Sequence, residues 1–323
     1  MDPTRIRTFG QALSAEVGRV IVGKSEVVEF LAVALLCEGH VLLEDVPGIG
    51  KTTMAKSLAR CLSSSFSRIQ FTPDLLPSDV TGIFFFNQKS GDFEFRAGPI
   101  HANVILADEI NRATPRTQSA LLEAMEERQV TVEGQTTSLP RPFVVLATQN
   151  PIELEGTFPL PEAQLDRFLL RLSIGYPTDT EEIAILRRFE TATPLEDVQS
   201  VASSAEIMAL VQDARQVYVD DSIAEYIVTL ARATRLHEAI ELGASPRASL
   251  ALFRASQARA ALRGRNYVIP DDAKSLVGPV FAHRLILRHQ GRLRGSDVQH
   301  VLDSIVEETP APVEPLPHAS PVA

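Results

Sequence analysis

Apolar positions along the chain recur with two different spacings. Short apolar runs with the composition of buried strands lie at 41–44, 66–71, 103–107, 142–148 and 168–172. Between some of these runs, apolar residues spaced three and four apart predict helices, notably over 24–38, 51–62 and 115–128. Because strands alternate with helices, the pattern predicts an α/β protein with a largely parallel sheet covered on both faces.

Two insertions interrupt this alternation. Residues 83–96 and 128–139 each place two β-prone runs around a turn that contains glycine, which predicts a β-hairpin at each position. Phe84, Phe85 and Phe86 lie on the first hairpin, where they would pack within the hairpin or contact another protein.

After about residue 177 the strand pattern stops and helical spacing takes over. Helices are predicted near 180–190, 203–217, 221–239, 246–263 and 271–287. We therefore expect a first domain over 1–177 and a helical second domain over 178–308, with a disordered, proline-rich tail over 309–323.

Composition narrows the class of protein. A chain of 323 residues is long enough for two domains, and 45% hydrophobic with 22% charged residues is ordinary for a soluble globular protein. No apolar run approaches the roughly 20 residues of a membrane span, and the first residues do not resemble a signal peptide, so we expect no membrane insertion and a cytoplasmic location. The net charge of −10 disfavours a dedicated nucleic-acid binder. Cys37 and Cys61 lie in helical patterns and fit buried free thiols.

The segment 44–53, EDVPGIGKTT, matches a phosphate-binding loop except that Asp45 occupies the first glycine position. It follows a predicted strand and opens a predicted helix, as such a loop requires. Lys51 would reach the β- and γ-phosphates of ATP, and the Thr52 hydroxyl would bind Mg²⁺. The predicted nucleotide-binding residues are Val46, Pro47, Gly48, Ile49, Gly50, Lys51, Thr52 and Thr53.

A second polar signal ends the apolar strand 103–107. Asp108 and Glu109 follow it directly, and the carboxyl ends of parallel strands meet at the edge where ligands bind. Asp108 would hold Mg²⁺, directly or through water, and Glu109 would polarise the attacking water as general base. Without a phosphate loop, the same acids would be expected only to cap the next helix.

Three further residues complete the predicted site. Asn150 ends the strand candidate 142–148 with Gln149 and could orient the lytic water. Arg167 precedes the last strand, and Arg247 lies in the first turn of a helix opened by Ser245 and Pro246. Arginines held in this way suit phosphate, although most arginines form surface or structural ion pairs.

The segments EDVPGIGKTT, DEINRA, ATQNP, LPEAQLDRF and SPRA, in this order and spacing, resemble the MoxR-type AAA+ ATPases over about residues 20–305. The resemblance implies a five-stranded αβα nucleotide domain, a small all-α lid and a homo-oligomeric ring, commonly hexameric. It assigns Asn150 as sensor 1, Arg167 as an arginine finger for a neighbouring copy's ATP, and Arg247 as sensor 2. It also identifies the two hairpins as the helix-2 insert and the pre-sensor-1 hairpin of this branch.

The resemblance further implies chaperone-like remodelling of protein complexes with a partner that contains a von Willebrand factor A domain. The alternatives are a metal-chelatase or gas-vesicle-type assembly ATPase, a DNA translocase, or a scaffold that binds nucleotide without turnover. Acidic charge disfavours the translocase. The complete set of Lys51, Glu109 and Arg167 disfavours the scaffold. No paired histidine spacing or nucleophile elbow predicts a protein metal site or another hydrolase.

Overall fold

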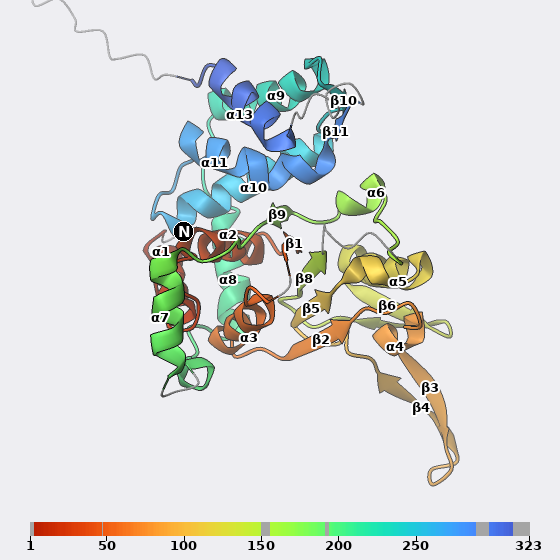
Figure 1. Cartoon of the computed structure of the whole chain (residues 1–323). Helices are drawn as coiled ribbons and strands as arrows, with labels where there is room; N and C mark the ends of the chain where they lie inside the picture. Colours follow the sequence, from red (N-terminus) through yellow and green to blue (C-terminus); the bar gives the residue numbers. More distant parts are fainter. Residues whose placement is uncertain (1–2, 47, 150–155, 191–193, 289–296, 313–323) are drawn as a thin grey trace, which may run out of the picture.

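The computed structural model of the chain describes residues 3–46, 48–149, 156–190, 194–288 and 297–312. At its centre lies a five-stranded sheet with the strand order β2-β5-β8-β1-β9, in which every neighbouring pair is parallel (Figure 1). Its strands are β1 (Val41–Glu44), β2 (Phe66–Gln70), β5 (Val104–Asp108), β8 (Val144–Gln149) and β9 (Leu170–Leu172). The five strand candidates of the first half therefore form one sheet, as predicted.

Helices cover both faces of this sheet. The helices of the first half are α1 (Pro3–Gly18), α2 (Ser25–Leu36), α3 (Lys51–Cys61), α4 (Pro77–Thr81), η1 (Ile110–Arg112), α5 (Pro115–Glu127) and α6 (Glu162–Leu165). Alternate residues of each strand point to opposite sides. In β1, Val41 and Leu43 pack in the core that contains α1, α2 and α3, while Leu42 packs in the smaller core formed with α5. This two-sided packing is the predicted αβα sandwich.

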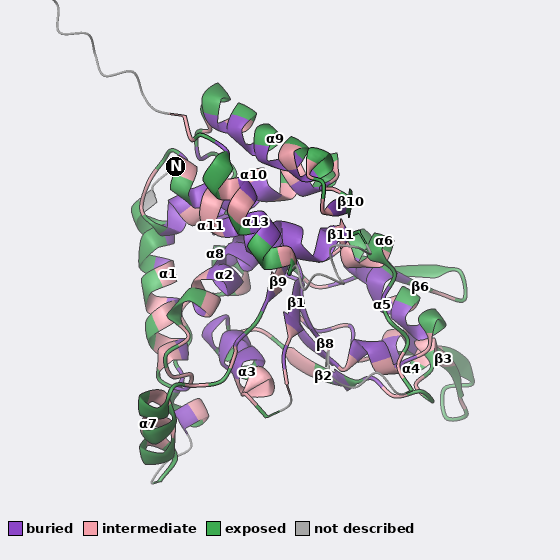
Figure 2. Ribbon diagram, turned by 45° about the horizontal axis from the view of Figure 1, so that its top comes forward, coloured by how far each residue is buried: buried purple, intermediate pink, exposed green. Residues whose placement is uncertain are grey.

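Both predicted hairpins are present. They are β3 (Gly82–Asn87) with β4 (Asp92–Ala97), and β6 (Gln129–Val132) with β7 (Gln135–Ser138). The first projects far from the body of the molecule (Figure 1). Phe84 stacks on Phe95 across the strands, whereas Phe86 and Phe93 stay 53% and 69% exposed although their rings touch. Packing within the hairpin thus accounts for Phe84 but leaves Phe86 and Phe93 in solvent, as the exposed hairpin in Figure 2 shows.

The second half is helical, with one departure from the prediction. Its elements are α7 (Asp179–Phe189), η2 (Pro194–Asp197), α8 (Ser204–Ala214), α9 (Asp221–Leu236), β10 (Ile240–Leu242), α10 (Pro246–Leu262), α11 (Pro270–Phe281), η3 (Ala282–Arg284), β11 (Ile286–Leu287) and α13 (Val298–Glu308). The helix predicted over 271–287 is wrong beyond Phe281, because β11 pairs there with β10. A strand as short as β11 fits the apolar spacing of a helix, so the sequence pattern could not distinguish it from the end of one. After α13, Thr309 is buried and donates to the carbonyl of Ile305, while 313–323 lie outside the described residues.

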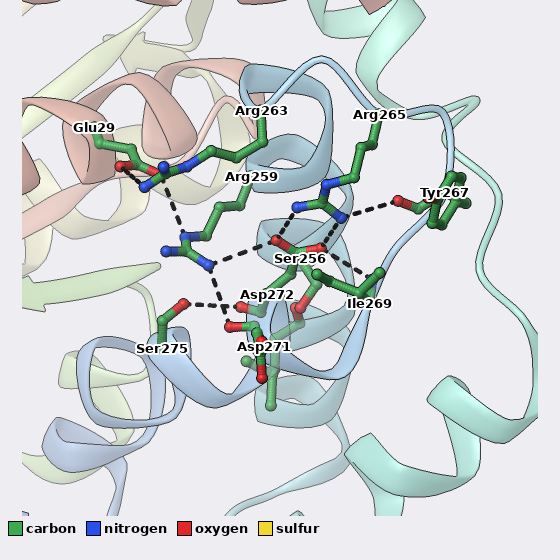
Figure 3. Close-up of polar contacts among 11 residues, drawn as sticks. Glu29, Ser256, Arg259, Arg263, Arg265, Tyr267, Ile269, Asp271, Asp272 and Ser275 are labelled. Carbon is green, nitrogen blue, oxygen red and sulfur yellow. Dashed lines mark hydrogen bonds and ion pairs between the residues drawn. The ribbon is translucent and has the colours of Figure 1, made fainter. Parts of the chain in front are cut away.

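Charged side chains join α10 to the sheet half of the molecule (Figure 3). Glu29 of α2 accepts two hydrogen bonds from the guanidinium of Arg263, at 3.0 and 2.7 Å, and lies 3.3 Å from Arg259. Arg259 in turn lies 3.5 Å from the fully buried Asp272 of α11, which also binds Arg265 through two bonds of 2.7 Å. This network connects α10 and α11 to α2 through polar contacts in addition to apolar packing.

Candidate functional site

The phosphate loop turns through two glycines. Gly48 and Gly50 have φ angles of 87° and 93°, in the left-handed region that residues with a side chain rarely adopt. A Cβ added at either glycine would meet nothing within 4 Å, so both lie on an open surface. Gly50 is the N-cap of α3, and no side chain caps the first turn of that helix. The first N–H groups of α3 are thereby available to an anion such as a phosphate.

Asp45, which departs from the loop pattern, anchors the loop to the segment after β9. Its buried carboxylate accepts hydrogen bonds from the Ser173 hydroxyl at 2.9 Å, the Ile174 N–H at 2.5 Å and the Gly175 N–H at 3.2 Å. The carbonyl of Asp45 accepts a bond of 2.9 Å from the Lys51 ammonium. Where the usual pattern has a flexible glycine, Asp45 therefore connects the loop to the segment that follows the edge strand β9. The sequence pattern did not reveal this role.

A cavity of about 390 Å³ opens beside this loop, and we call it the phosphate-loop cavity. Gly48, Gly50 and Thr53 form one wall, and mainly apolar side chains of segments 20–24 and 174–177 and of α7 form the others. A polar backbone wall opposite apolar side chains suits a ligand with both phosphate and an aromatic base. Among the predicted residues, Pro47 lies outside the described residues.

The acidic pair lies at the same edge of the sheet. Leu43 of β1 is level with Thr148 of β8, and Ala107 of β5 is level with Ala147 of β8. Asp108 therefore ends β5 beside Thr148, two strands from the start of the loop, or roughly 10 Å at normal strand spacing. The structure thus brings the loop and the acids to one edge, as the sequence predicts.

Polar neighbours hold both acids in place. The Thr148 hydroxyl donates to Asp108 at 2.6 Å and accepts from the N–H of Glu109 at 2.8 Å. Arg68 binds the other oxygen of Asp108 at 2.6 Å. The carboxylate of Glu109 accepts from Gln70 at 2.9 Å and lies 3.2 Å from the guanidinium of Arg112.

Sequence reasoning missed three of these neighbours. Arg68 and Gln70 alternate along β2, and Thr148 precedes the polar end of β8. Polar residues at the carboxyl end of a predicted core strand were the available signal. Asn150, which was predicted at the same strand end, lies outside the described residues.

The described residues contain no group of three or more His, Cys, Asp or Glu side chains that could hold a metal ion by itself. Mg²⁺ commonly binds through one or two protein oxygens together with phosphate oxygens and water. The Thr52 hydroxyl and the Asp108 carboxylate fit that arrangement. The donor set is therefore compatible with a magnesium ion that arrives with a nucleotide.

Arg167 and Arg247 lie together in a second cavity of about 310 Å³, which we call the arginine cavity. Both bind the carboxylate of Glu126 in α5, with Nε of Arg167 at 3.0 Å and Nη1 of Arg247 at 3.3 Å. Three more arginines of the cavity lining, Arg128, Arg254 and Arg284, increase its positive charge. This cavity has no lining residue in common with the phosphate-loop cavity.

A buried arginine fixes the backbone around Arg167. The guanidinium of Arg284 in η3 binds the Asp166 carboxylate at 2.6 Å and donates to the carbonyls of Phe168 at 2.7 Å and Leu169 at 3.2 Å. Burial lowers the pKa of Arg284, while Asp166 opposes that shift. His283 adds a hydrogen bond of 2.9 Å to the Phe168 carbonyl. The helical half of the chain therefore positions the segment that carries Arg167.

The two cavities lie at opposite ends of β1. Gly39 and His40, which precede the strand, line the arginine cavity, whereas the phosphate loop follows the strand at Asp45. At about 3.3 Å per residue, the five steps from His40 to Asp45 span roughly 16 Å. The structure thus brings Arg167 and Arg247 to each other, but not to the phosphate loop of the same chain.

Comparison with known proteins agrees with this geometry. The ATPase family associated with various cellular activities (AAA) matches residues 40–170, and an AAA lid domain matches residues 232–305. Uncharacterized protein YeaC of Bacillus subtilis is 50% identical over 306 residues, 95% of each chain. Chaperone MoxR1 of Mycobacterium tuberculosis is 42% identical over 92% of this chain and 81% of its own. A crystal structure from Cytophaga hutchinsonii, described as a candidate ATPase, matches with a TM-score of 0.90 and 38% identity, covering 96% of this chain and 97% of that chain.

The chain is a MoxR-type AAA+ ATPase. The predicted family and the αβα fold with a helical lid region are therefore confirmed. Membership of this MoxR-type family implies nucleotide binding and suggests assembly into an oligomer. Within the described ranges, no helix is long and apolar enough to cross a bilayer.

Proposed function

We propose that this MoxR-type ATPase hydrolyses Mg²⁺-ATP between adjacent copies of itself and uses the cycle to remodel partner protein complexes. One observation most strongly supports hydrolysis between adjacent copies: the arginine cavity lies at the other end of β1 from the phosphate loop. An arginine that acts on ATP from there must act on another copy's nucleotide. Hydrolysis then depends on assembly, because the transition-state charge stays uncompensated until the interface forms.

Within one chain, each residue has a proposed role. The open N-terminus of α3 and Lys51 bind the phosphates, and Glu109 orients and deprotonates the attacking water. Bound Mg²⁺, held by Thr52 and Asp108, would neutralise charge on the β- and γ-phosphates. Asn150, outside the described residues, would orient the same water. Gln70 donates a hydrogen bond to Oε2 of Glu109 and would hold that carboxylate in place beside the attacking water.

We propose that the region 178–308 works as a lid whose rotation is coupled to the arginine cavity. Arg284 and His283 bind the backbone beside Arg167, so a rotation of this region would move the arginine with it. The exposed β3–β4 hairpin, with Phe86 and Phe93 at 53% and 69% exposure, would contact the client. A hexameric ring, a partner with a von Willebrand factor A domain and a cytoplasmic location complete the proposal.

Subunit mixing tests whether Arg167 acts in trans. Arg167→Ala keeps an intact nucleotide site without the arginine, and Glu109→Gln keeps the arginine without the base. Each variant alone should lose about 10³-fold in turnover. In an equal mixture, one interface in about four (one half times one half) pairs an intact site with an intact arginine, so up to about a quarter of wild-type turnover should return.

The matched control is Arg116→Ala, an exposed arginine of α5, which should retain wild-type turnover alone and in mixtures. Native mass spectrometry would establish that the variants exchange into common rings. A mixture that forms common rings and stays inactive would contradict action in trans. The remodelling half is tested by ATP-dependent retention of a von Willebrand factor A-domain protein on Glu109→Gln, and loss of that dependence would count against it.

A further inference from the structure

Glu126 joins the two arginines of the arginine cavity. It lies in the last turn of α5, Arg167 follows α6, and Arg247 lies in the first turn of α10, so three separate elements meet at one carboxylate. Oε2 of Glu126 lies 3.0 Å from Nε of Arg167, and Oε1 lies 3.3 Å from Nη1 of Arg247. We propose that Glu126 is a positioning residue that holds the two guanidinium groups side by side for the nucleotide of a neighbouring copy. This assignment rests on the proposed function and adds Glu126, which has no other role in that proposal.

Two neighbouring guanidinium groups need to be held in a fixed arrangement if both are to bind one phosphate group. Their like charges repel, and both side chains are long and have many rotamers. A carboxylate between them removes the repulsion and selects one rotamer of each. Asp166 continues the alternation of charge, since it lies 3.8 Å from Arg247 and 2.6 Å from the buried Arg284. The row of charges therefore runs from Arg167 to Arg284 with an acid between each pair of bases.

A positioning residue must itself be fixed, and the end of α5 is fixed from two sides. The carbonyl of Met125, next to Glu126, is 3.0 Å from Nε2 of the buried His40. Arg128, two residues after Glu126, binds the side chain of Glu38 at 2.9 Å and its carbonyl at 3.0 Å. These bonds tie α5 to the segment before β1, so the Glu126 backbone cannot follow the arginines if they move.

A phosphate group can also displace the Glu126 carboxylate from the two arginines. The side chain of Glu126 is 36% exposed and that of Arg247 is 51% exposed, so their ion pairs are weakened by water. A γ-phosphate has more negative charge than a carboxylate and offers three acceptor oxygens to the same two arginines. Glu126 therefore orients the pair before a neighbour arrives without outcompeting the neighbour's nucleotide.

Subunit mixing with Glu126→Ala tests this assignment. Alone, the variant should turn over ATP roughly tenfold more slowly, as is typical when a residue that orients a functional group is removed. Its ATP dissociation constant should stay within about twofold of wild type, because Glu126 does not line the phosphate-loop cavity. Mixing with Glu109→Gln should restore turnover, because that variant supplies intact arginines. Mixing with Arg167→Ala should restore none, because both then lack a working arginine pair.

Glu127→Ala, at the next exposed position of α5, removes the same charge and should behave as wild type in every mixture. Glu126→Gln keeps an acceptor and should give an intermediate turnover with the same mixing pattern. If Glu126→Ala unfolds, shown by a lost thermal transition, Glu126→Gln decides the question by that pattern.

Three results would overturn the assignment: wild-type turnover by Glu126→Ala, faster turnover than wild type, or recovery with Arg167→Ala instead of Glu109→Gln. Failure of Arg167→Ala and Glu109→Gln to complement each other would overturn the proposed function and this assignment together. Recovery of that pair without the expected Glu126 pattern would overturn this assignment alone.

Discussion

The phosphate-loop cavity and the arginine cavity differ in how the chain builds them. The first takes its phosphate wall from Gly48, Ile49, Gly50 and Thr53, which lie close together in the sequence at the start of α3. The second gathers side chains from Cys37 to Arg284, and neighbours in space such as Glu126 and Arg247 are 121 residues apart in sequence. A local motif is thus sufficient to define one half of the proposed active site, whereas the other half exists only after the helical region has packed.

Their chemistry differs in the same way. Backbone N–H groups and apolar side chains line the phosphate-loop cavity, and this combination suits a whole nucleotide. Paired arginines and acids line the arginine cavity, which suits only the charged end of such a ligand. In the proposed function, one copy of the chain therefore supplies the binding half and a second copy supplies the charge-stabilising half.

The largest expected effect is a loss of ATP binding and turnover, and it should distinguish the role of the phosphate-loop cavity from that of the arginine cavity. Lys51→Ala should abolish detectable ATP binding and lower turnover by roughly 10³-fold or more, because the phosphates lose their main cation in the same chain. Arg247→Ala should keep ATP affinity within about threefold while turnover falls, because Arg247 lies in the arginine cavity. Calorimetry for binding and phosphate release for turnover would measure both.

Lys56→Ala, an exposed lysine of α3, is the control for the loss of charge. A large loss of ATP affinity in isolated Arg247→Ala chains would contradict the separation, since it would place Arg247 on its own chain's nucleotide.

A smaller effect concerns His40, at the arginine-cavity end of β1. Burial lowers the pKa of His40 to about 4, although its bond to the Met125 carbonyl opposes the shift. The Val145 N–H donates to Nδ1 at 3.0 Å, so the neutral ring has its proton on Nε2. In the unfolded chain His40 protonates near pH 6.5. The unfolded state therefore binds more protons as the pH falls from about 6.5 to about 4, and the free energy of unfolding should drop by about 3 kcal/mol over that range.

Urea unfolding of wild type and His40→Gln at several pH values would measure this contribution. Glutamine can accept from Val145 and donate to Met125 without titrating, so the variant should lose less stability on acidification. Equal acid dependence in the two proteins would show that His40 does not contribute.

The smallest effect concerns Asp45, at the other end of β1. Asp45→Gly restores the usual phosphate-loop pattern and, by sequence alone, should be neutral. The structure predicts instead that the free energy of unfolding falls by about 2 kcal/mol. Three charge-assisted hydrogen bonds to 173–175 are lost and a glycine is gained, while water that enters the space left by the side chain restores part of the hydrogen bonding.

Denaturant unfolding would measure the change, with Asp45→Asn as an intermediate that keeps an acceptor. ATP affinity should weaken with stability, because the loop loses its anchor. Unchanged stability in Asp45→Gly would show that the carboxylate bonds do not hold the loop.

Much of the fold was predictable because its signals are local. Apolar runs of four to seven residues predicted the five sheet strands, and turns that contain glycine predicted both hairpins. The β10–β11 pair was not predictable, since Ile286 and Leu287 continue the apolar spacing of α11 and only their pairing with the distant Ile240 makes them a strand.

By itself, the sequence determined the order of elements, the phosphate loop and the acids at the end of β5, because strand ends and helix starts are set by residues near in the chain. Only the tertiary structure decided which partners the site residues contact. Asp45 binds the segment after β9, Glu109 binds Gln70, and Arg167 and Arg247 both bind Glu126. The reason is physical. A side chain's partner depends on which surfaces pack together, and no spacing along the chain records that choice.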